Sequence, residues 1–505
     1  MQRKQLNQPQ NLAPRRKLMY KFERYRQLGL ADFNQPVGLK MNPENRWVKK
    51  AETIPWDAIE EKYAKLFPSK TGMPAKPLRM ALGSLLIQKQ LGFSDRELVE
   101  EIMENPYFQY FIGLPGYQTE APFVPSLLVE FRKRLTDDIL GEINEMIIAY
   151  NTPDDPTTGG GSNPDTTATD TVENNGTLIL DATCAPQNIS FPQDVNLLNE
   201  ARENLEGIVD DICRRFDYYV PRMYRRNARK DYLNLAKCKK RTGKKIRKAI
   251  KQQLQYIRRD RKYIDELLDT ECELTPKQAE RLAVIDKVYE QQKYMYKNKV
   301  HSVPDRIVSI SQPYIRPIVR GKAAAPVEFG AKMDLSLDEK GMARIEKISF
   351  DAYNESDVLI VAVERYFERT GHYPERILAD KIYRNRNNLA YCREHGIRLS
   401  GLSLGRPKKD AGIDKKTEYK DNADRIAVER AFALAKQKYG LGLITSRLDE
   451  TTRSSIALSV IAMNVDRICR FLLRLLYDIV FSRYRQHKFM LIFIQNNNVG
   501  NLACC

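Results

Sequence analysis

The sequence lacks an apolar run long enough to span a membrane as a helix. The best candidate, residues 471–481, is interrupted by Arg474 and Asp478, whereas a membrane helix needs about 20 consecutive apolar residues. The start of the chain is basic but lacks the apolar stretch of a secretory signal peptide. We therefore expect a cytoplasmic protein that has no membrane partner.

The chain also lacks the patterns that bind zinc, form disulfides or bind nucleotides. Its eight cysteines include no CxxC pair and its four histidines are far apart, which argues against a structural zinc site. Thiols in a reducing compartment normally stay free, so we expect no disulfides. No GxxxxGK[ST] motif is present, and we expect no reaction driven by nucleotide hydrolysis.

Positive charge is abundant and concentrated in one segment. The net charge is +18, and between Arg222 and Lys262 there are 18 Lys or Arg against only two acidic residues. Such a density favours a polyanion, because each neutralised phosphate releases counterions. A solvated helical face is the alternative. Apolar residues recur here at near-helical spacing, so we favour a folded helix pair with one basic side. Its DNA-binding candidates are Lys244, Lys245, Arg247 and Lys248.

Changes of composition divide the 505 residues into regions, and the length suggests about three domains. Almost no apolar side chain occurs between residues 151 and 176, where Gly, Pro, Thr and Asp abound, as in a flexible linker. The expected regions are a polar N-terminal region (1–70), a helical domain for DNA binding or dimerisation (71–150), the linker (151–176), an α/β domain (177–485) with a basic helical insertion at about 195–300, and a C-terminal tail (486–505) without an assigned function.

Residues 77–114 predict two helices joined by a turn at Gly92. Ser94 and Glu97 form a capping box at the start of the second helix. This pair is typical of a helix-turn-helix that places a helix in the major groove of DNA. An ordinary helical hairpin that packs against another subunit explains the pattern equally well.

The part after the linker predicts an α/β domain. The strand TLILDAT comes first, and after the basic helices follow the strands VEFGAKMDLSL and ARIEKISF, a helix, the strands ERILAD and IRLSGL, and a long helix over 422–439. This order of elements is that of a ribonuclease-H-like α/β domain, here preceded by the all-α, helix-turn-helix-like N-terminal domain.

Two aspartates end short apolar strands, Asp181 in LILD and Asp380 in RILAD. Ligands gather at the carboxyl ends of strands in an open α/β sheet, so these carboxylates can meet at one site. Either aspartate alone is weak evidence, because many strand-end aspartates only form turns.

Glu429 is the candidate for a third carboxylate. It lies beside the apolar face of the helix over 422–439, where it can reach the sheet. The alternative is a surface ion pair between Arg425 and Glu429, four residues apart, worth only a few tenths of a kcal/mol.

Three crowded carboxylates repel one another unless a cation neutralises them. Oxygen ligands suit Mg²⁺ or Mn²⁺. Two such ions can activate a water or a 3′-hydroxyl and stabilise the leaving oxygen of a phosphodiester. We therefore expect Asp181, Asp380 and Glu429 to be the catalytic residues and to bind two Mg²⁺ or Mn²⁺ ions.

At these residues the chain resembles the DDE transposases of bacterial insertion sequences, closest to the insertion-sequence-four and insertion-sequence-five groups. The resemblance runs over residues 78–470. It is carried by the N-terminal helical segment LRMALGSLLIQKQLGFSDRELVEEIMENPYFQYFIGL, by LILDATCAPQNISFPQDVNLL and ILADKIYRNRNN around the aspartates, and by RIAVERAFALAKQKYGL around the glutamate.

The family signature around the glutamate is Tyr-x2-Arg-x3-Glu-x6-Lys. Arg425, Glu429 and Lys436 match it in spacing, whereas Asn422 stands at the Tyr position. The resemblance implies that Arg425 and Lys436 hold phosphates near the cut. It implies a structural and not a catalytic role for Asp194.

The resemblance implies a transposase that cleaves DNA strands and joins them to target DNA by two-metal phosphoryl transfer. Its partner would be DNA, both the terminal inverted repeats of the element and the target, bound by a homodimer associated with the nucleoid. Two alternatives stay open: a metal-dependent nuclease without strand transfer, and a non-catalytic DNA-binding protein from a defective element.

Overall fold

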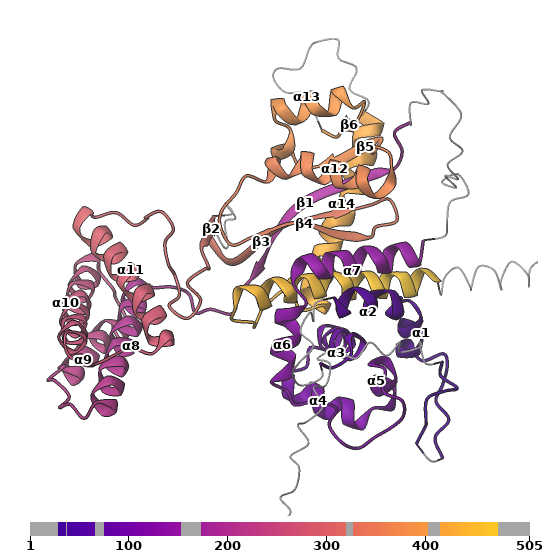
Figure 1. The fold of residues 1–505 in the computed structure, drawn as a ribbon. Coiled ribbons are helices and arrows are strands. Elements are labelled where there is room, and N and C mark those ends of the chain that lie inside the picture. Colours follow the sequence, from indigo (N-terminus) through magenta and orange to yellow (C-terminus); the bar gives the residue numbers. More distant parts are fainter. Residues whose placement is uncertain are drawn as a thin grey trace, which may run out of the picture.

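The computed structural model describes residues 29–36, 38–65, 75–152, 173–319, 327–401 and 415–472. Figure 1 shows helices of the N-terminal part below a sheet with its own helices, and a helical bundle to one side. Most of the expected linker and all of the expected tail lie outside the described residues. Among the described residues, no helix combines the length and apolar character needed to cross a membrane.

The regular elements of the described N-terminal part are helices, joined by loops. Its helices are α1 (Arg46–Glu52), α2 (Trp56–Ala64), α3 (Leu78–Leu91), α4 (Asp95–Glu104), α5 (Pro106–Phe111), α6 (Leu127–Arg134) and α7 (Asp137–Tyr150). The expected capping box is present, because the Glu97 N–H donates to Ser94 Oγ (3.3 Å) and the Ser94 N–H donates to Glu97 Oε2 (2.8 Å). Gly92 ends α3 in the left-handed conformation (φ 77°), which glycine adopts without strain.

A DNA-binding role for the α3–α4 hairpin is not confirmed. Ten consecutive residues of α3, Leu78–Ile87, are buried. The outward residues of α4 include Glu97, Glu100 and Glu104, with Arg96 as the single exposed cation of that helix. A recognition helix with this charge would repel DNA phosphates, so α4 fits a packing role better.

The sheet is mixed and contains six strands in the order β2-β3-β1-β5-β6, with β4 also paired to β3. The strands are β1 (Thr177–Pro186), β2 (Pro317–Val319), β3 (Val327–Leu337), β4 (Ala343–Ser349), β5 (Arg376–Ala379) and β6 (Arg398–Leu399). β3 is antiparallel to β1 and β4, whereas β1, β5 and β6 are parallel. This order of strands agrees with the α/β arrangement that the sequence predicts.

Helices follow the strands and cover the sheet (Figure 1). They are the 3-10 helices η2 (Glu355–Val358) and η3 (Lys381–Tyr383), the helices α12 (Leu359–Thr370), α13 (Arg386–Glu394) and α14 (Lys415–Lys438), and a last helix over 449–472. α14 packs against β1 and β5.

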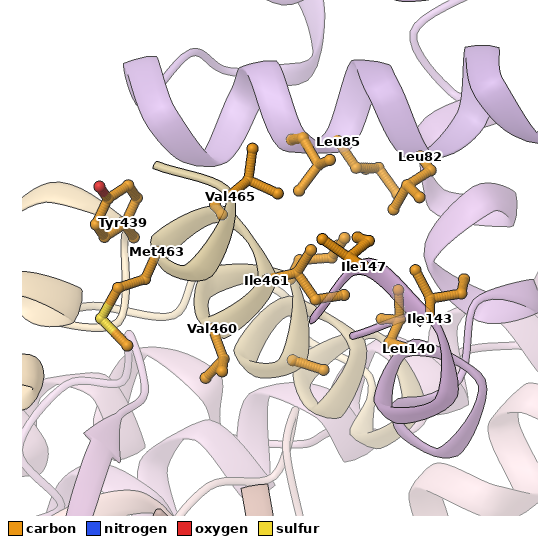
Figure 2. Packing of buried hydrophobic residues seen from close by; sticks show 14 of the residues in the cluster. Leu82, Leu85, Leu140, Ile143, Ile147, Tyr439, Val460, Ile461, Met463 and Val465 are labelled. Atoms are coloured by element: carbon orange, nitrogen blue, oxygen red, sulfur yellow. The ribbon is translucent and has the colours of Figure 1, made fainter. Parts of the chain in front are cut away.

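The N-terminal helices and the sheet domain share one hydrophobic core. The last helix provides Val460, Ile461 and Val465, which lie among Leu82 and Leu85 of α3 and the leucine and isoleucines of α7 (Figure 2). Each such buried side chain contributes about 1.5–3 kcal/mol relative to exposure. These residues come from both ends of the chain, so neither part is built independently of the other.

The segment between β1 and β2 forms a helical bundle with a core of its own. Its helices are α8 (Asp194–Arg215), α9 (Arg225–Ala236), α10 (Gly243–Leu268) and α11 (Pro276–Asn298). Asp194, at the start of α8, accepts hydrogen bonds from Gln292 (2.9 Å) and Arg306 (2.5 Å). This carboxylate therefore ties the first helix of the bundle to α11 and to the segment after it, as a structural residue would.

Candidate active site where β5 ends beside β1

Two aspartates stand next to each other on neighbouring strands. Asp380 directly follows β5, whereas Asp181 lies in the middle of β1, because β1 continues to Pro186 and does not end at Asp181 as the sequence predicts. β1 and β5 pair in parallel with Leu180 opposite Ala379, so Asp181 and Asp380 follow at equivalent positions. Asp181 Oδ1 accepts a hydrogen bond from the Ala182 N–H (2.8 Å). Asp380 caps η3, because its Oδ1 accepts from the Lys381 N–H (2.7 Å). The parallel register thus places side by side two residues that are 199 positions apart.

The two carboxylates differ in their surroundings. Asp181 is half-buried and Asp380 is exposed. The pKa of Asp181 is raised to about 6, mainly by burial and to a smaller extent by the negative charges of Glu355 and Asp380, whereas the Ala182 N–H and Arg425 oppose this rise. A carboxylate crowded by other carboxylates is where a bound cation would relieve repulsion.

Glu429 does not join the two aspartates in this structure. Its side chain is 54% exposed, and Oε1 lies 3.4 Å from Nη2 of Arg425, four residues earlier on α14. The described residues contain no group of three His, Cys, Asp or Glu close enough to hold a metal ion. The surface ion pair considered as an alternative is therefore formed, and the three-carboxylate site stays a prediction.

On the neighbouring strand β3 lies a buried carboxylate that the sequence analysis missed. Asp334 of β3 stands opposite Ala182 and is fully buried. Tyr383 donates a hydrogen bond to it at 2.9 Å, and Tyr353 donates a second one. Burial raises the pKa of Asp334 to about 6, although both tyrosine hydrogen bonds oppose this rise. An aspartate within the apolar strand segment KMDLSL was the available signal.

This buried cluster fixes the segment that carries the second aspartate. Tyr383 is the last residue of η3, the 3-10 helix that Asp380 caps, and it is fully buried. On the other side, Lys332 pairs with Glu355 at 2.9 Å and donates to the Tyr353 carbonyl at 2.9 Å. The hydrogen bonds to Asp334 therefore join η3, the loop before η2 and the sheet next to the two aspartates.

The candidate DNA-binding residues occupy two places. Arg425 and Lys436 lie on α14 and are half-buried. The four residues chosen from the basic segment lie at the start of α10, where Lys244, Lys245 and Lys248 are exposed. The guanidinium of Arg247 instead lies over the ring of Tyr296, 4.2 Å from its centroid.

The neighbouring helix α9 adds basic residues that the sequence did not single out. A shallow hollow of about 570 Å³ is lined by Arg226, Arg229, Lys230, Leu233, Asn234, Lys237 and Cys238. Its four cations are all exposed, and none pairs with a carboxylate in the part of the chain that the structure describes. The basic surface therefore extends from the start of α10 over α9.

Two segments of the chain match models of known families. Residues 377–466 match the family described as "Transposase DDE domain", and residues 38–134 match "Transposase domain (DUF772)". Both matches support a DDE transposase of insertion sequences. The first match includes Asp380, Arg425, Glu429 and Lys436, whereas Asp181 lies outside both matches.

A curated relative covers a shorter stretch. The "Uncharacterized protein ORF8 in nfe locus" of Rhizobium meliloti is 32% identical to this transposase over 111 residues, which are 22% of this chain and 53% of that protein. This chain therefore spans about half the length of the relative. No solved structure matches the transposase.

Proposed function

We propose that this transposase binds the ends of a mobile DNA element, cleaves DNA there and joins the freed ends to target DNA. The observation that carries the proposal is the pairing of β1 and β5, which sets Asp181 and Asp380 side by side. The edge where parallel strands end is the usual ligand site of an open α/β sheet. A phosphodiester is the substrate that the DDE family match indicates.

Mg²⁺ or Mn²⁺ fits the donors at this edge, and we propose two such ions. The ligands would be Asp181, Asp380 and Glu429, which are oxygen donors of the kind these ions prefer. The raised pKa of Asp181, due to burial and then to neighbouring carboxylates, marks a place where positive charge is favourable. When bound, the ions would supply an activated oxygen nucleophile and a stabilised leaving oxygen.

Glu429 can bind a metal ion only after its ion pair with Arg425 has opened. The two side chains are held at 3.4 Å on the surface of α14, where an ion pair contributes less than about 1 kcal/mol. Opening this pair frees Glu429 to turn toward the aspartates and frees Arg425 to hold a DNA phosphate. Substrate and metal would thus favour the same rearrangement, which couples DNA binding to completion of the site.

The bundle α8–α11 would bind DNA without sequence specificity. The exposed cations at the start of α10 and on α9 form a broad basic surface. Phosphate contacts of this kind give affinity and orientation but little specificity. On α14, Lys436 would hold a further phosphate beyond Arg425. Two copies of the chain, one for each element end, would make the active complex.

Strand transfer and simple hydrolysis differ in which nucleophile is held in place. A DNA 3′-hydroxyl and a water attack a phosphodiester in the same way, and positioning selects between them. A nuclease without strand transfer is the second candidate, because it would use the same aspartates. The extended basic surface favours transfer, since two DNA segments must be held together.

A strand-transfer assay tests the proposal. The transposase is incubated with Mg²⁺, a pre-cut element end and a plasmid, and covalently joined DNA is expected. Asp181→Ala serves as the control and should give no joined product. If the wild type yields only nicked or shortened DNA, the nuclease assignment replaces the transposase reaction proposed for this chain.

A further inference from the structure

A large cavity lies between the N-terminal helices and the segment after α14, away from the two aspartates. Its volume is about 740 Å³. One wall comes from the end of α3, the start of α4 and α6, and the other from residues 440–455. Gly440 turns the chain in the left-handed conformation (φ 72°), which brings this segment against α3.

Lys89 is the central charged group of this cavity. Its Nζ lies 2.5 Å from Oγ of Ser455 on the last helix. No carboxylate pairs with it within the described residues. Lys89 is half-buried. Burial, and to a smaller extent the positive charge of Arg132, together lower its pKa to about 7. The amine therefore lies beside a second cation without a counter-charge, so a bound anion would favour its protonated form.

Two arginines, two carboxylates and several hydroxyl groups also line the cavity. The carboxylates are Asp95, which pairs with Arg132, and Glu97, which accepts a hydrogen bond from the Ser94 N–H. Arg132 is held by Asp95 through both Nη atoms (3.1 and 2.5 Å) and by Gln88 (2.6 Å). Arg447 is exposed and forms no ion pair with any residue in the described ranges. The hydroxyl-bearing lining residues are Ser94, Thr445, Ser446, Thr451 and Ser455. Cations with hydroxyl donors are the groups that bind phosphate oxygens.

We propose that this cavity binds a backbone phosphate of the DNA on which the transposase acts, with Lys89 and Arg447 as its principal cationic contacts. The assignment of the phosphate to DNA rests on the function proposed above. A phosphate there supplies the counter-charge that Lys89 lacks. Arg132 stays on Asp95 and adds positive potential without leaving its partner.

The position of the cavity suits a DNA segment that also reaches the active site. Glu429 and Gly440 are 11 residues apart at the end of α14, which corresponds to about 16 Å along a helix. Duplex DNA covers that length in about five base pairs at 3.4 Å each. Lys436 lies between the two points, so one duplex running along α14 can contact all three.

Thermal unfolding with inorganic phosphate tests the cavity independently of DNA. Phosphate should raise the Tm of the wild-type transposase more than chloride does at equal ionic strength. Lys89→Met, which keeps the length of the side chain, should abolish this difference, and Arg447→Gln should reduce it. Lys62→Met is the matched control, because Lys62 is exposed on α2 and paired with Glu142; it should leave the difference unchanged.

DNA binding at several salt concentrations tests the source of the phosphate. Lys89→Met should weaken binding of a duplex and reduce the slope of log K against log salt by about one. If wild type shows no phosphate-specific rise in Tm, the cavity assignment is wrong. A Lys89-dependent rise in Tm with unchanged DNA slopes would overturn the DNA assignment and leave a free-anion site.

The Arg447→Gln variant separates loss of binding from loss of folding. Because Arg447 is exposed, its substitution removes no buried contact. Arg447→Gln should reduce the DNA slope in the same direction as Lys89→Met, and identical slopes for Arg447→Gln and wild type would count against the proposal. Absence of strand transfer together with Lys89-dependent binding of phosphate and DNA would refute only the proposed reaction. The cavity and the reaction can thus fail separately.

Discussion

The two large parts of this transposase are built in different ways. The body, which consists of α1–α7, the sheet with its helices and the last helix, joins residues as far apart as Thr53 and Cys469, separated by 416 positions. The bundle α8–α11 is built from one continuous segment and has its own core. The body depends on long-range contacts, whereas the bundle is largely local.

Their charged groups differ in the same way. In the body, Asp181 is half-buried and Asp334 is buried, and burial raises the pKa of both carboxyl groups. On the bundle, the cations of α9 and of the start of α10 are exposed to solvent. The proposed catalytic residues thus lie where packing holds their positions, whereas the residues proposed to attract DNA lie on an accessible surface.

The largest expected effect is on the carboxylates of the body. Asp181→Ala, Asp380→Ala and Glu429→Gln should each reduce DNA cleavage by about 10³-fold or more, because each removes a proposed metal ligand. Binding to element ends should stay, since the bundle supplies it. Cleavage and gel-shift assays on the same proteins measure both.

Asp351→Ala is the matched control for these variants, because Asp351 is an exposed aspartate of the same domain. It should cleave like wild type. Cleavage that survives two of the three active-site changes would contradict the site assignment. Loss of DNA binding in the same variants would show that the body, and not the bundle alone, supplies the affinity for DNA.

The same contrast explains what the sequence could predict. The basic segment was visible because its charges are neighbours in sequence, and Asp181 and Asp380 were visible because each follows a short apolar run. Only Asp380 follows the end of its strand, because β1 continues past Asp181 to Pro186. The Asp334 cluster was not visible in the sequence, because Tyr353 and Tyr383 reach that carboxylate only through the packing of η2 and η3.

Two further features depended on tertiary structure. The position of Glu429 beside the apolar face of α14 allowed both a metal ligand and a surface ion pair, and side-chain rotamers decide between them. The shared core was hidden too, because nothing in the apolar sequence of residues 449–472 indicates that they pack against α3 and α7 (Figure 2).

The next effect concerns the stability of the body. Asp466 of the last helix pairs with Lys50 (2.6 Å) and Lys438 (2.6 Å) and accepts a hydrogen bond from Tyr439 (2.7 Å). Burial opposes ionisation, but the two lysines lower its pKa to about 2. Asp466→Asn leaves Lys50 buried without its partner and should lower the free energy of unfolding by about 3 kcal/mol.

Chemical denaturation measures this loss, and Lys438→Met is its control. Lys438 is half-exposed, so its removal should cost less than about 1 kcal/mol. Hydrogen exchange of the α8–α11 amides should stay unchanged in Asp466→Asn. Faster exchange throughout the bundle would show that body and bundle unfold as one unit.

A smaller effect is expected on the bundle. Neutralising Lys244, Lys245, Arg247 and Lys248 together should weaken binding to all DNAs by about 10- to 100-fold and flatten the salt dependence. The matched control neutralises four lysines of α11, Lys277, Lys287, Lys293 and Lys297. Salt titrations should show a larger change of slope for the first set. Equal slopes for both sets would mean that the start of α10 does not contact DNA.

The smallest effect is a pH dependence confined to the body. Glu60 of α2 is buried and accepts a hydrogen bond from the Leu78 N–H (3.3 Å), and burial raises its pKa to about 7. A raised folded-state pKa means that stability is complete below about 4.5 and declines as pH rises toward 7. Glu60→Gln keeps the hydrogen bond without the charge, so it should stabilise the body by about 1 kcal/mol at pH 8 and not at pH 4.

Glu61→Gln is the control, because Glu61 is a neighbouring exposed residue, and it should change stability at neither pH. Denaturation curves at both pH values decide the matter, and equal stabilisation by Glu60→Gln at pH 4 and pH 8 would show that ionisation of Glu60 is not the cause.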